Sequence, residues 1–189
     1  MYEQLKKYLR HNITVGDDIL NEIVQSFKPV RFRKNSILLS HGEVCDTLYF
    51  INKGCMRTYY LTLTGSEKTR YIAVEGIVIT ALNSFISQTA SFEFIDSLED
   101  VELLCISRSA FYRLAEKYPE WGKFYLRLLE FAYIYQNKKI EELVTLSAGE
   151  RYALLMKEYP GYIKRLSNKI LASYLDITQE TLSRLKSRQ

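Results

Sequence analysis

The last two dozen residues constrain the fold of this chain more than any other segment. Residues 166–188 read LSNKILASYLDITQETLSRLKSR, which predicts two short helices joined by a tight turn. Apolar residues at i, i+1 and i+4 give the first helix one buried face, and leucines three apart give the second helix another. A helix pair of this kind can lay its second helix in the major groove of DNA. The apolar positions are Leu171, Ala172, Leu175, Leu182 and Leu185.

Residues with suitable side chains stand where the helices should begin and turn. Ser167 and Thr178 are good N-caps, because a hydroxyl can accept a hydrogen bond from an orphan backbone N–H. Asp176 occupies the turn position that often needs a left-handed conformation, which Asp tolerates better than most residues. Ile177 can fill the angle between the helices. The segment is therefore predicted to be a helix-turn-helix.

Positive charge is concentrated beside this segment. Residues 148–189 contain eight Lys and Arg against four Asp and Glu, whereas residues 1–147 contain 18 of each kind. The whole net charge of +4 thus lies in the last 42 residues. This asymmetry favours a dedicated surface for phosphate groups. The alternative is that a C-terminal helix pair is mildly basic without binding DNA.

Composition excludes several classes of protein. A chain of 189 residues with 47% hydrophobic residues can bury a core. It has no apolar run of about 20 residues, and its N-terminus lacks the apolar stretch of a signal peptide, so we expect a cytoplasmic protein without membrane contact. Cys45, Cys55 and Cys105 are widely spaced and form no C-x-x-C pair, so we expect buried thiols, no metal and no cofactor.

The remaining chain falls into three zones. Residues 1–28 show helical apolar spacing. Residues 30–107 alternate as strands, with turns at 52–54 and 64–66, which predicts a compact antiparallel barrel or roll. From Ser109 onward the spacing becomes helical again, and a separate helix is expected from Glu150 to Tyr159 before a break at Pro160. The fold class is therefore predicted to be α+β.

One long helix carries an apolar seam with steps of 4, 3, 4 and 3. Such spacing is typical of a coiled coil and favours a dimer helix over 121–146. The alternative is a helix packed on its own roll. The predicted seam residues are Trp121, Tyr125, Leu128, Ala132 and Tyr135.

Three motifs in order now point to a known family. HGEVCDTLYFINKG at 41–54 is similar to a G-E-x-x-x-x-L-Y-x-I-x-x-G hairpin, SFEFIDSLED follows at 91–100, and the helix-turn-helix ends the chain. Over essentially its full length the chain resembles the Crp/Fnr transcription regulators. The resemblance implies an effector-type β-roll with N-terminal helices at 1–119, a dimerisation helix at 120–147 and a DNA-binding domain at 148–189.

The resemblance breaks at the segment that binds cyclic nucleotides in that family. The family's phosphate-binding cassette reads roughly G-E-L, then R-S or R-T about ten residues later. Here alanine replaces both the glutamate and the arginine, so we expect no response to cyclic AMP. The oxygen-sensing cysteine cluster of the family is also missing. The candidate effector-pocket residues are Thr80, Ala81, Leu82, Ala90 and Ser91.

The resemblance also assigns roles at the DNA end. Gln179, Glu180 and Arg184 match the family's R-E-T-x-x-R pattern, with Gln replacing the first Arg, and are predicted to read bases. Glu180 can alternatively serve the first turn of the helix electrostatically. Any wing is expected to be rudimentary and to lie at 161–165. The predicted phosphate contacts are Lys164, Arg165, Ser167, Asn168, Lys169, Thr178, Lys186 and Arg188.

The sequence therefore predicts a homodimeric regulator that binds a palindromic operator and is not an enzyme. RNA polymerase and an unidentified small-molecule effector are the further partners to consider. One rival is a cupin-like metalloenzyme, for which only His11 and His41 could supply imidazole ligands. The other rival is a ligand-sensing module that uses its C-terminal helices to bind a protein.

Overall fold

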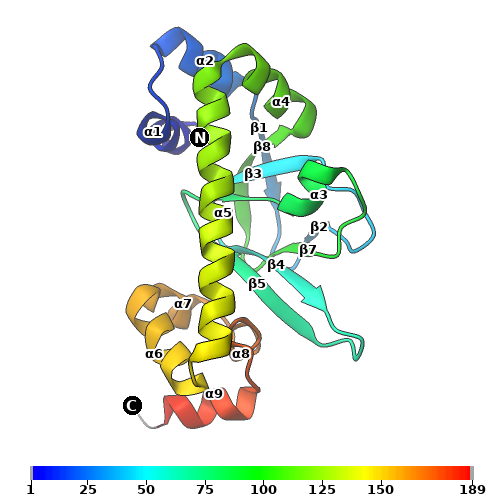
Figure 1. Cartoon of the computed structure of the whole chain (residues 1–189), viewed down its shortest axis with the longest axis vertical. Coiled ribbons are helices and arrows are strands. Elements are labelled where there is room, and N and C mark those ends of the chain that lie inside the picture. Colours follow the sequence, from blue (N-terminus) through cyan, green and yellow to red (C-terminus); the bar gives the residue numbers. More distant parts are fainter. Residues whose placement is uncertain (1, 188–189) are drawn as a thin grey trace. The chain divides into compact units, whose positions relative to one another are not determined.

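A computed structural model describes residues 2–187, and Figure 1 shows the helices and strands. The chain forms two compact units. The first contains the residues up to Tyr60 together with Tyr71–Leu128, and the second contains Leu61–Arg70 together with the residues from Leu129 onward. The tip of one β-hairpin thus belongs with the C-terminal helices. This division differs from the expected boundaries at 119 and 147, because the two units share the long helix.

The first unit is built around two four-stranded sheets. One sheet has the order β1-β8-β3-β6 and the other has the order β2-β7-β4-β5. The pairs β1–β8, β2–β7, β3–β6, β3–β8 and β4–β7 are antiparallel, which confirms the predicted antiparallel roll. The strands are β1 Lys28–Phe32, β2 Ile37–Leu39, β3 Thr47–Lys53, β4 Met56–Leu61, β5 Glu67–Ala73, β6 Val78–Ile79, β7 Phe94–Ser97 and β8 Val101–Ser107.

Gly54 makes the turn between β3 and β4 possible. Its φ is +96°, in the region that favours glycine. A Cβ atom at this position would lie 2.6 Å from the carbonyl oxygen of Asp100. The predicted glycine turn is therefore confirmed, and it needs glycine for both its backbone conformation and its close packing.

Four complete helices and the start of a fifth complete the first unit. They are α1 Glu3–Asn12, α2 Asp17–Gln25, α3 Leu82–Ser87, α4 Arg108–Lys117 and the first part of α5 Pro119–Thr145. Their apolar faces join the strands in one core that includes Leu9, Phe50, Phe111 and Trp121. Cys45 and Cys55 are buried and Cys105 is half-buried.

Helix α5 presents the predicted seam to its own chain. The Trp121 side chain is fully buried, and its indole Nε1 donates to the carbonyl of Phe111 at 3.1 Å. The Tyr125 hydroxyl lies 2.9 Å from the Tyr112 hydroxyl on α4. The prediction that this face forms a dimer seam is therefore wrong, because the aromatic side chains fill a core within one protomer.

The rest of the predicted seam follows the same face. Leu128 packs against the core of the first unit, and Ala132 is half-buried. In the second unit, the Tyr135 hydroxyl lies 3.0 Å from the Tyr174 hydroxyl. A spacing of 4, 3, 4 and 3 marks a helix face that is covered, but it does not say whether the cover is a partner or the same chain.

The second unit contains four short helices beside the rest of α5. They are α6 Ala148–Glu158, α7 Pro160–Arg165, α8 Asn168–Leu175 and α9 Gln179–Lys186. A capping box formed by Ser147 and Glu150 starts α6. Pro160 does not end the helical region, because it occupies the first turn of α7, where its missing N–H costs nothing. The predicted wing at 161–165 is therefore wrong, since these residues are helical. Within residues 2–187, no helix combines the length and apolar content that crossing a bilayer requires.

Candidate nucleic-acid interface and effector region

Helices α8 and α9 have the local geometry of a helix-turn-helix. Ser167 accepts a hydrogen bond from the Ile170 amide at 3.3 Å, and Thr178 accepts one from the Thr181 amide at 3.2 Å. Asp176 adopts the left-handed conformation with φ of +55°. Both predicted N-caps and the predicted turn are thus confirmed, and each follows from the preference of a side chain for its local backbone.

Apolar side chains fix the angle between the two helices. Leu171, Ala172 and Leu175 on α8 are buried, and Leu182 on α9 is fully buried. Leu185 is half-buried on the same side of α9. Because this side of α9 is covered by its own unit, the other side is left for a ligand. The buried positions are those that the sequence predicted.

The predicted base-reading residues lie on the uncovered side of α9. The side chains of Gln179, Glu180 and Arg184 are exposed. The Arg184 guanidinium donates to the Thr181 hydroxyl at 3.3 Å, a long contact that a stronger acceptor can replace. Ser183 lies on the same exposed face between Glu180 and Arg184, and sequence reasoning missed it. Helical geometry brings all four side chains to one surface.

Glu180 is engaged with the start of its own helix. The pKa of its carboxyl is lowered, first by a hydrogen bond from its own backbone amide and then by one from the Thr178 hydroxyl. This arrangement is the helix-start role that the sequence left as an alternative. A carboxylate held there keeps a second oxygen and remains exposed, so the role in the helix and a role in base contact are compatible.

The predicted phosphate contacts lie mostly at exposed positions around the start of α8. Lys164, Ser167, Asn168 and Lys169 are exposed. The Lys186 ammonium, at the end of α9, donates to the Asn168 side chain at 2.6 Å and so returns to the same region. Arg165 and Thr178 are also exposed, whereas Arg188 lies outside the described residues. The ammonium of Lys169 contacts the carboxylate of Glu67 at 2.6 Å.

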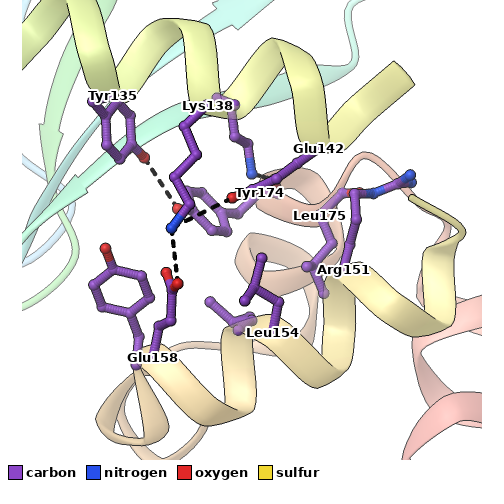
Figure 2. A pocket seen from close by; sticks show the side chains of 11 residues that line it. Tyr135, Lys138, Glu142, Arg151, Leu154, Glu158, Tyr174 and Leu175 are labelled. Atoms are coloured by element: carbon purple, nitrogen blue, oxygen red, sulfur yellow. Dashed lines mark hydrogen bonds and ion pairs between the residues drawn. The ribbon is translucent and has the colours of Figure 1, made fainter. Parts of the chain in front are cut away.

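Two cations brace the C-terminal end of α8 on the neighbouring helices. The Lys139 ammonium on α5 donates to the carbonyl of Tyr174 at 2.9 Å, and Arg151 Nε on α6 donates to the carbonyl of Leu175 at 3.1 Å. Both carbonyls belong to the last turn of α8, where no later amide of the same helix can donate to them. Figure 2 shows Tyr135, Arg151 and Tyr174 around the small hollow between these helices.

Burial changes the proton affinity of Lys139. Its ammonium lies 3.7 Å from the centre of the Tyr174 ring, and desolvation lowers the pKa of Lys139 to about 8. Near it, an ion pair of 2.8 Å joins Lys138 on α5 to Glu158 on α6. The Lys139 ammonium that contacts α8 is thus largely removed from water, whereas Lys138 and Glu158 are exposed.

In the roll, the predicted effector residues make contacts within their own chain. The Thr80 hydroxyl donates to the carbonyl of Thr47 at 2.9 Å, and Ala81 is 1% exposed. Leu82 is half-buried as the first residue of α3, and Ala90 forms an isolated antiparallel bridge with Val44. Thr80 and Ala90 are therefore both bonded to the backbone of their own chain.

Ser91 follows the same pattern as Thr80. Its hydroxyl donates to the carbonyl of Glu93 at 3.0 Å and accepts from the amide of Glu93 at 2.9 Å. The side chain is buried, so both hydrogen bonds are shielded from water. A hydroxyl with these two local partners is well placed to shape the turn before β7.

A buried ion pair occupies the sheet beside this segment. The Arg57 guanidinium on β4 donates two hydrogen bonds of 2.9 Å to the carboxylate of Asp96 on β7. It also lies 4.1 Å from the centre of the Tyr59 ring. Arg57 is thus committed to a bidentate pair, and sequence reasoning gave no sign of this because the two residues are far apart in the chain.

Helix α5 has a second, exposed apolar stripe. Leu126, Tyr133 and Ile140 are spaced seven residues apart, and Ile134 and Val144 flank them. Their side chains are between 56% and 79% exposed. The stripe lies on the side of α5 opposite the covered face of Trp121 and Tyr135. Asn137 lies within it, four residues after Tyr133 and three before Ile140.

The part of the chain that the structure describes contains no cluster of side chains suited to binding a metal ion. Within residues 2–187 there is no group of three or more His, Cys, Asp and Glu side chains that could hold an ion. His41 lies in an aromatic contact with Phe92, with ring centres 5.7 Å apart. His11 lies on α1, outside the sheets.

Comparisons with known proteins agree with this architecture. A family model of the cyclic nucleotide-binding domain matches residues 29–118. The anaerobic regulatory protein of Haemophilus influenzae is 26% identical over 182 residues, which cover 90% of this chain and 69% of that protein.

Two solved structures share the fold at low identity. FixK2 from Bradyrhizobium japonicum has a TM-score of 0.76 at 18% identity, with 86% of this chain and 83% of that chain covered. The catabolite activator protein of Thermus thermophilus has a TM-score of 0.60 at 19% identity, with coverage of 92% and 83%. The likeness extends over both the roll and the C-terminal helices.

Proposed function

Because this chain belongs to the Crp/Fnr family of transcriptional regulators, we propose that it binds a two-fold symmetric DNA site as a homodimer. The chain is thus a regulator and not an enzyme. The observation that supports DNA binding most directly is the geometry of α9. Its apolar side is buried on α8, while Gln179, Glu180 and Arg184 are exposed together. A helix with this division can place its polar side in the major groove.

The exposed side chains suit direct base contacts. The Arg184 guanidinium can donate two hydrogen bonds to guanine, and the Gln179 amide can pair with adenine. The carboxylate of Glu180 can accept from the amino group of cytosine. Ser183 lies among them and can donate to or accept from either kind of base. Lys164, Lys169 and Lys186 would then fix the helix on the phosphate backbone without reading sequence.

The exposed stripe of α5 is our candidate for the dimer interface. A row of large apolar side chains on a helix in water favours association, because burying that surface removes it from water. Leu126, Tyr133 and Ile140 repeat every seven residues, and Val144 and Asn137 occupy the alternate positions of the same stripe. An asparagine at one such position favours a two-stranded parallel pair in one register.

The roll is proposed to act without cyclic AMP. The family's glutamate and arginine are replaced by Ala81 and Ala90, and Ala81 is buried. The nearby Arg57 is paired with Asp96 and would have to leave that partner to reach a phosphate. The chemistry of any effector is therefore expected to differ from that of an anionic cyclic nucleotide.

The proposal is tested by measuring DNA affinity as a function of salt. The protein should enrich a duplex from a random-sequence pool, and its affinity for that duplex should fall steeply between 50 and 200 mM salt, by about 10³-fold or more. Lys164→Ala should make the slope shallower by about two charges per dimer. If no duplex is enriched and affinity for DNA is negligible at low salt, the C-terminal helices serve another partner, such as a protein.

A further inference from the structure

The tip of the β4–β5 hairpin contacts one stripe of helix α8. Three consecutive hairpin residues, Glu67, Lys68 and Thr69, meet Lys169, Ser173 and Asp176. The helix residues are spaced four and three apart, so they lie on one side of α8. Both partners belong to the second compact unit, although about 100 residues separate them in the sequence. We call this set of six residues the hairpin latch.

Hydrogen bonds of Ser173 form the centre of the latch. Its hydroxyl accepts from the amide of Thr69 at 2.7 Å and donates to the carbonyl of Glu67 at 2.9 Å. The Thr69 hydroxyl lies 2.9 Å from the same oxygen. A single side chain on α8 thus completes backbone groups at the start of β5. These bonds specify one register between hairpin and helix.

Ion pairs flank this centre on both sides. Lys169, in the first turn of α8, contacts Glu67, whose side chain is only 21% exposed. Lys68 contacts Asp176, the left-handed residue of the helix-turn-helix turn. The hairpin therefore places a carboxylate beside one of the lysines that DNA binding would use, and a lysine beside the turn that sets the angle of α9.

We propose that the hairpin latch is an intramolecular competitor of DNA, in which Glu67 holds Lys169 until a phosphate group replaces it. The proposal rests on the proposed DNA-binding function. A phosphate beside Lys169 would lie close to the Glu67 carboxylate, and two anions at that distance repel each other. Binding therefore requires the hairpin tip to withdraw. Withdrawal also removes the hydrogen bonds of Ser173, because Glu67 and Thr69 are neighbours in one strand.

The latch gives the β-hairpin a way to influence the DNA-binding helices. Strands β4 and β5 continue from the tip into the sheet of the roll. Any ligand that favours the withdrawn hairpin must, by linkage, also favour DNA binding, and DNA must favour that ligand equally. Withdrawal breaks the ion pairs of Glu67 with Lys169 and of Lys68 with Asp176, together with the hydrogen bonds of Ser173, in each protomer.

The test compares Glu67→Gln with Glu102→Gln, a matched loss of one carboxylate. Glu102 lies on β8 in the first unit, where it pairs with Arg31. The probes are a duplex enriched by the wild-type protein and a duplex of random sequence. Glu67→Gln should tighten binding to both probes roughly 3- to 10-fold and steepen the salt slope by about two charges per dimer. Glu102→Gln should leave both unchanged. Equal effects of the two variants would overturn the latch.

Lys169→Ala and Glu67→Gln together form a double-mutant cycle. If Glu67 and DNA compete for Lys169, Lys169→Ala should weaken binding more in the Glu67→Gln protein than in the wild-type protein. Additive effects would mean that Glu67 acts only as a distant charge. Ser173→Ala, which changes no charge, should also tighten binding, by a smaller factor, and unchanged or weaker binding would contradict a latch that holds the hairpin.

Amide hydrogen exchange separates the latch from the DNA-binding proposal. In the wild-type protein, DNA should accelerate exchange at 61–70, since the Thr69 amide loses its partner. Unchanged or slower exchange on DNA that binds normally would overturn the latch alone. If the wild-type protein binds neither duplex with salt-dependent affinity, the proposed function fails, and the latch as a competitor of DNA fails with it.

Discussion

The predicted cassette segment of the roll and the outer face of α9 differ in what their polar side chains contact. In the roll, Thr80 and Ser91 turn their hydroxyls onto neighbouring backbone carbonyls. On α9, Gln179 and Arg184 extend from a helix whose other side is buried. Polar groups that hold their own backbone give a fixed loop, whereas exposed ones can meet a ligand. The outer face of α9 therefore presents polar side chains to solvent, whereas the hydroxyls of Thr80 and Ser91 are bonded within their own chain.

The largest expected effect concerns the interface that would pair two copies of α9. Ile140→Glu places a charge in the exposed stripe of α5 and should dissociate the dimer, with at least about 100-fold weaker binding to a two-fold site. Ile37→Glu, at a similarly exposed isoleucine on β2, is the matched control and should remain dimeric. Light scattering would show both states. A dimeric Ile140→Glu protein would mean that α5 pairs through another surface.

The next effect concerns base contacts on α9. Arg184→Ala should lose about 1–3 kcal/mol on the selected site and relax the preference at one base position of each half-site. Lys164→Ala should weaken selected and random duplexes alike. Competition binding against both duplexes measures the difference. Equal losses on both duplexes after Arg184→Ala would make Arg184 a phosphate contact.

A smaller effect concerns the buried ammonium that braces α8. Burial lowers the pKa of Lys139 from 10.5 to about 8, so between these values the folded protein binds fewer protons than the unfolded chain. The stability of the wild-type protein should therefore rise relative to Lys139→Met as pH increases from 8 to 10.5, by about 1–2 kcal/mol. Urea denaturation at both pH values measures this change, and a constant difference would show that Lys139 is well solvated.

The last prediction is that cyclic AMP does not bind. Cyclic AMP at millimolar concentration should give no saturable heat in calorimetry, because Ala81 and Ala90 offer the ribose and phosphate no charged partner. The Asp96→Asn protein gives a stricter test of the same expectation, because the substitution weakens the ion pair that holds Arg57. Saturable micromolar binding to the wild-type protein would show that Arg57 or another cation reaches the phosphate, and the contrast between the two regions would then be wrong.

Local chemistry made much of the C-terminal unit predictable from the sequence. Ser167, Thr178 and Asp176 each follow a preference for one backbone state, and Leu171 and Leu182 follow helical spacing. The antiparallel roll was equally accessible through its alternation and glycine turns. The departures of Ala81 and Ala90 from the family's cassette remain a prediction from the sequence.

Long-range packing was not predictable in the same way. Both sides of α5 are apolar, so the periodicity of Trp121 and Tyr125 could not say which side faces its own chain. The sequence predicts a break at Pro160 and any wing at 161–165, but proline also begins helices, and local spacing does not separate the two cases. The contacts of Glu67 with Lys169 and of Arg57 with Asp96 depend on the folded topology, and neither residue type nor local spacing indicates them.

The central claim is that α9 reads DNA as one half of a symmetric pair, and selection from a random-sequence duplex pool tests it most directly. The wild-type protein should enrich an inverted repeat with half-site centres about 10 base pairs apart, and Arg184→Ala should lose the preference at one position in each half. Enrichment of no sequence, or of a site without two-fold symmetry that Arg184→Ala reads equally well, would contradict the account.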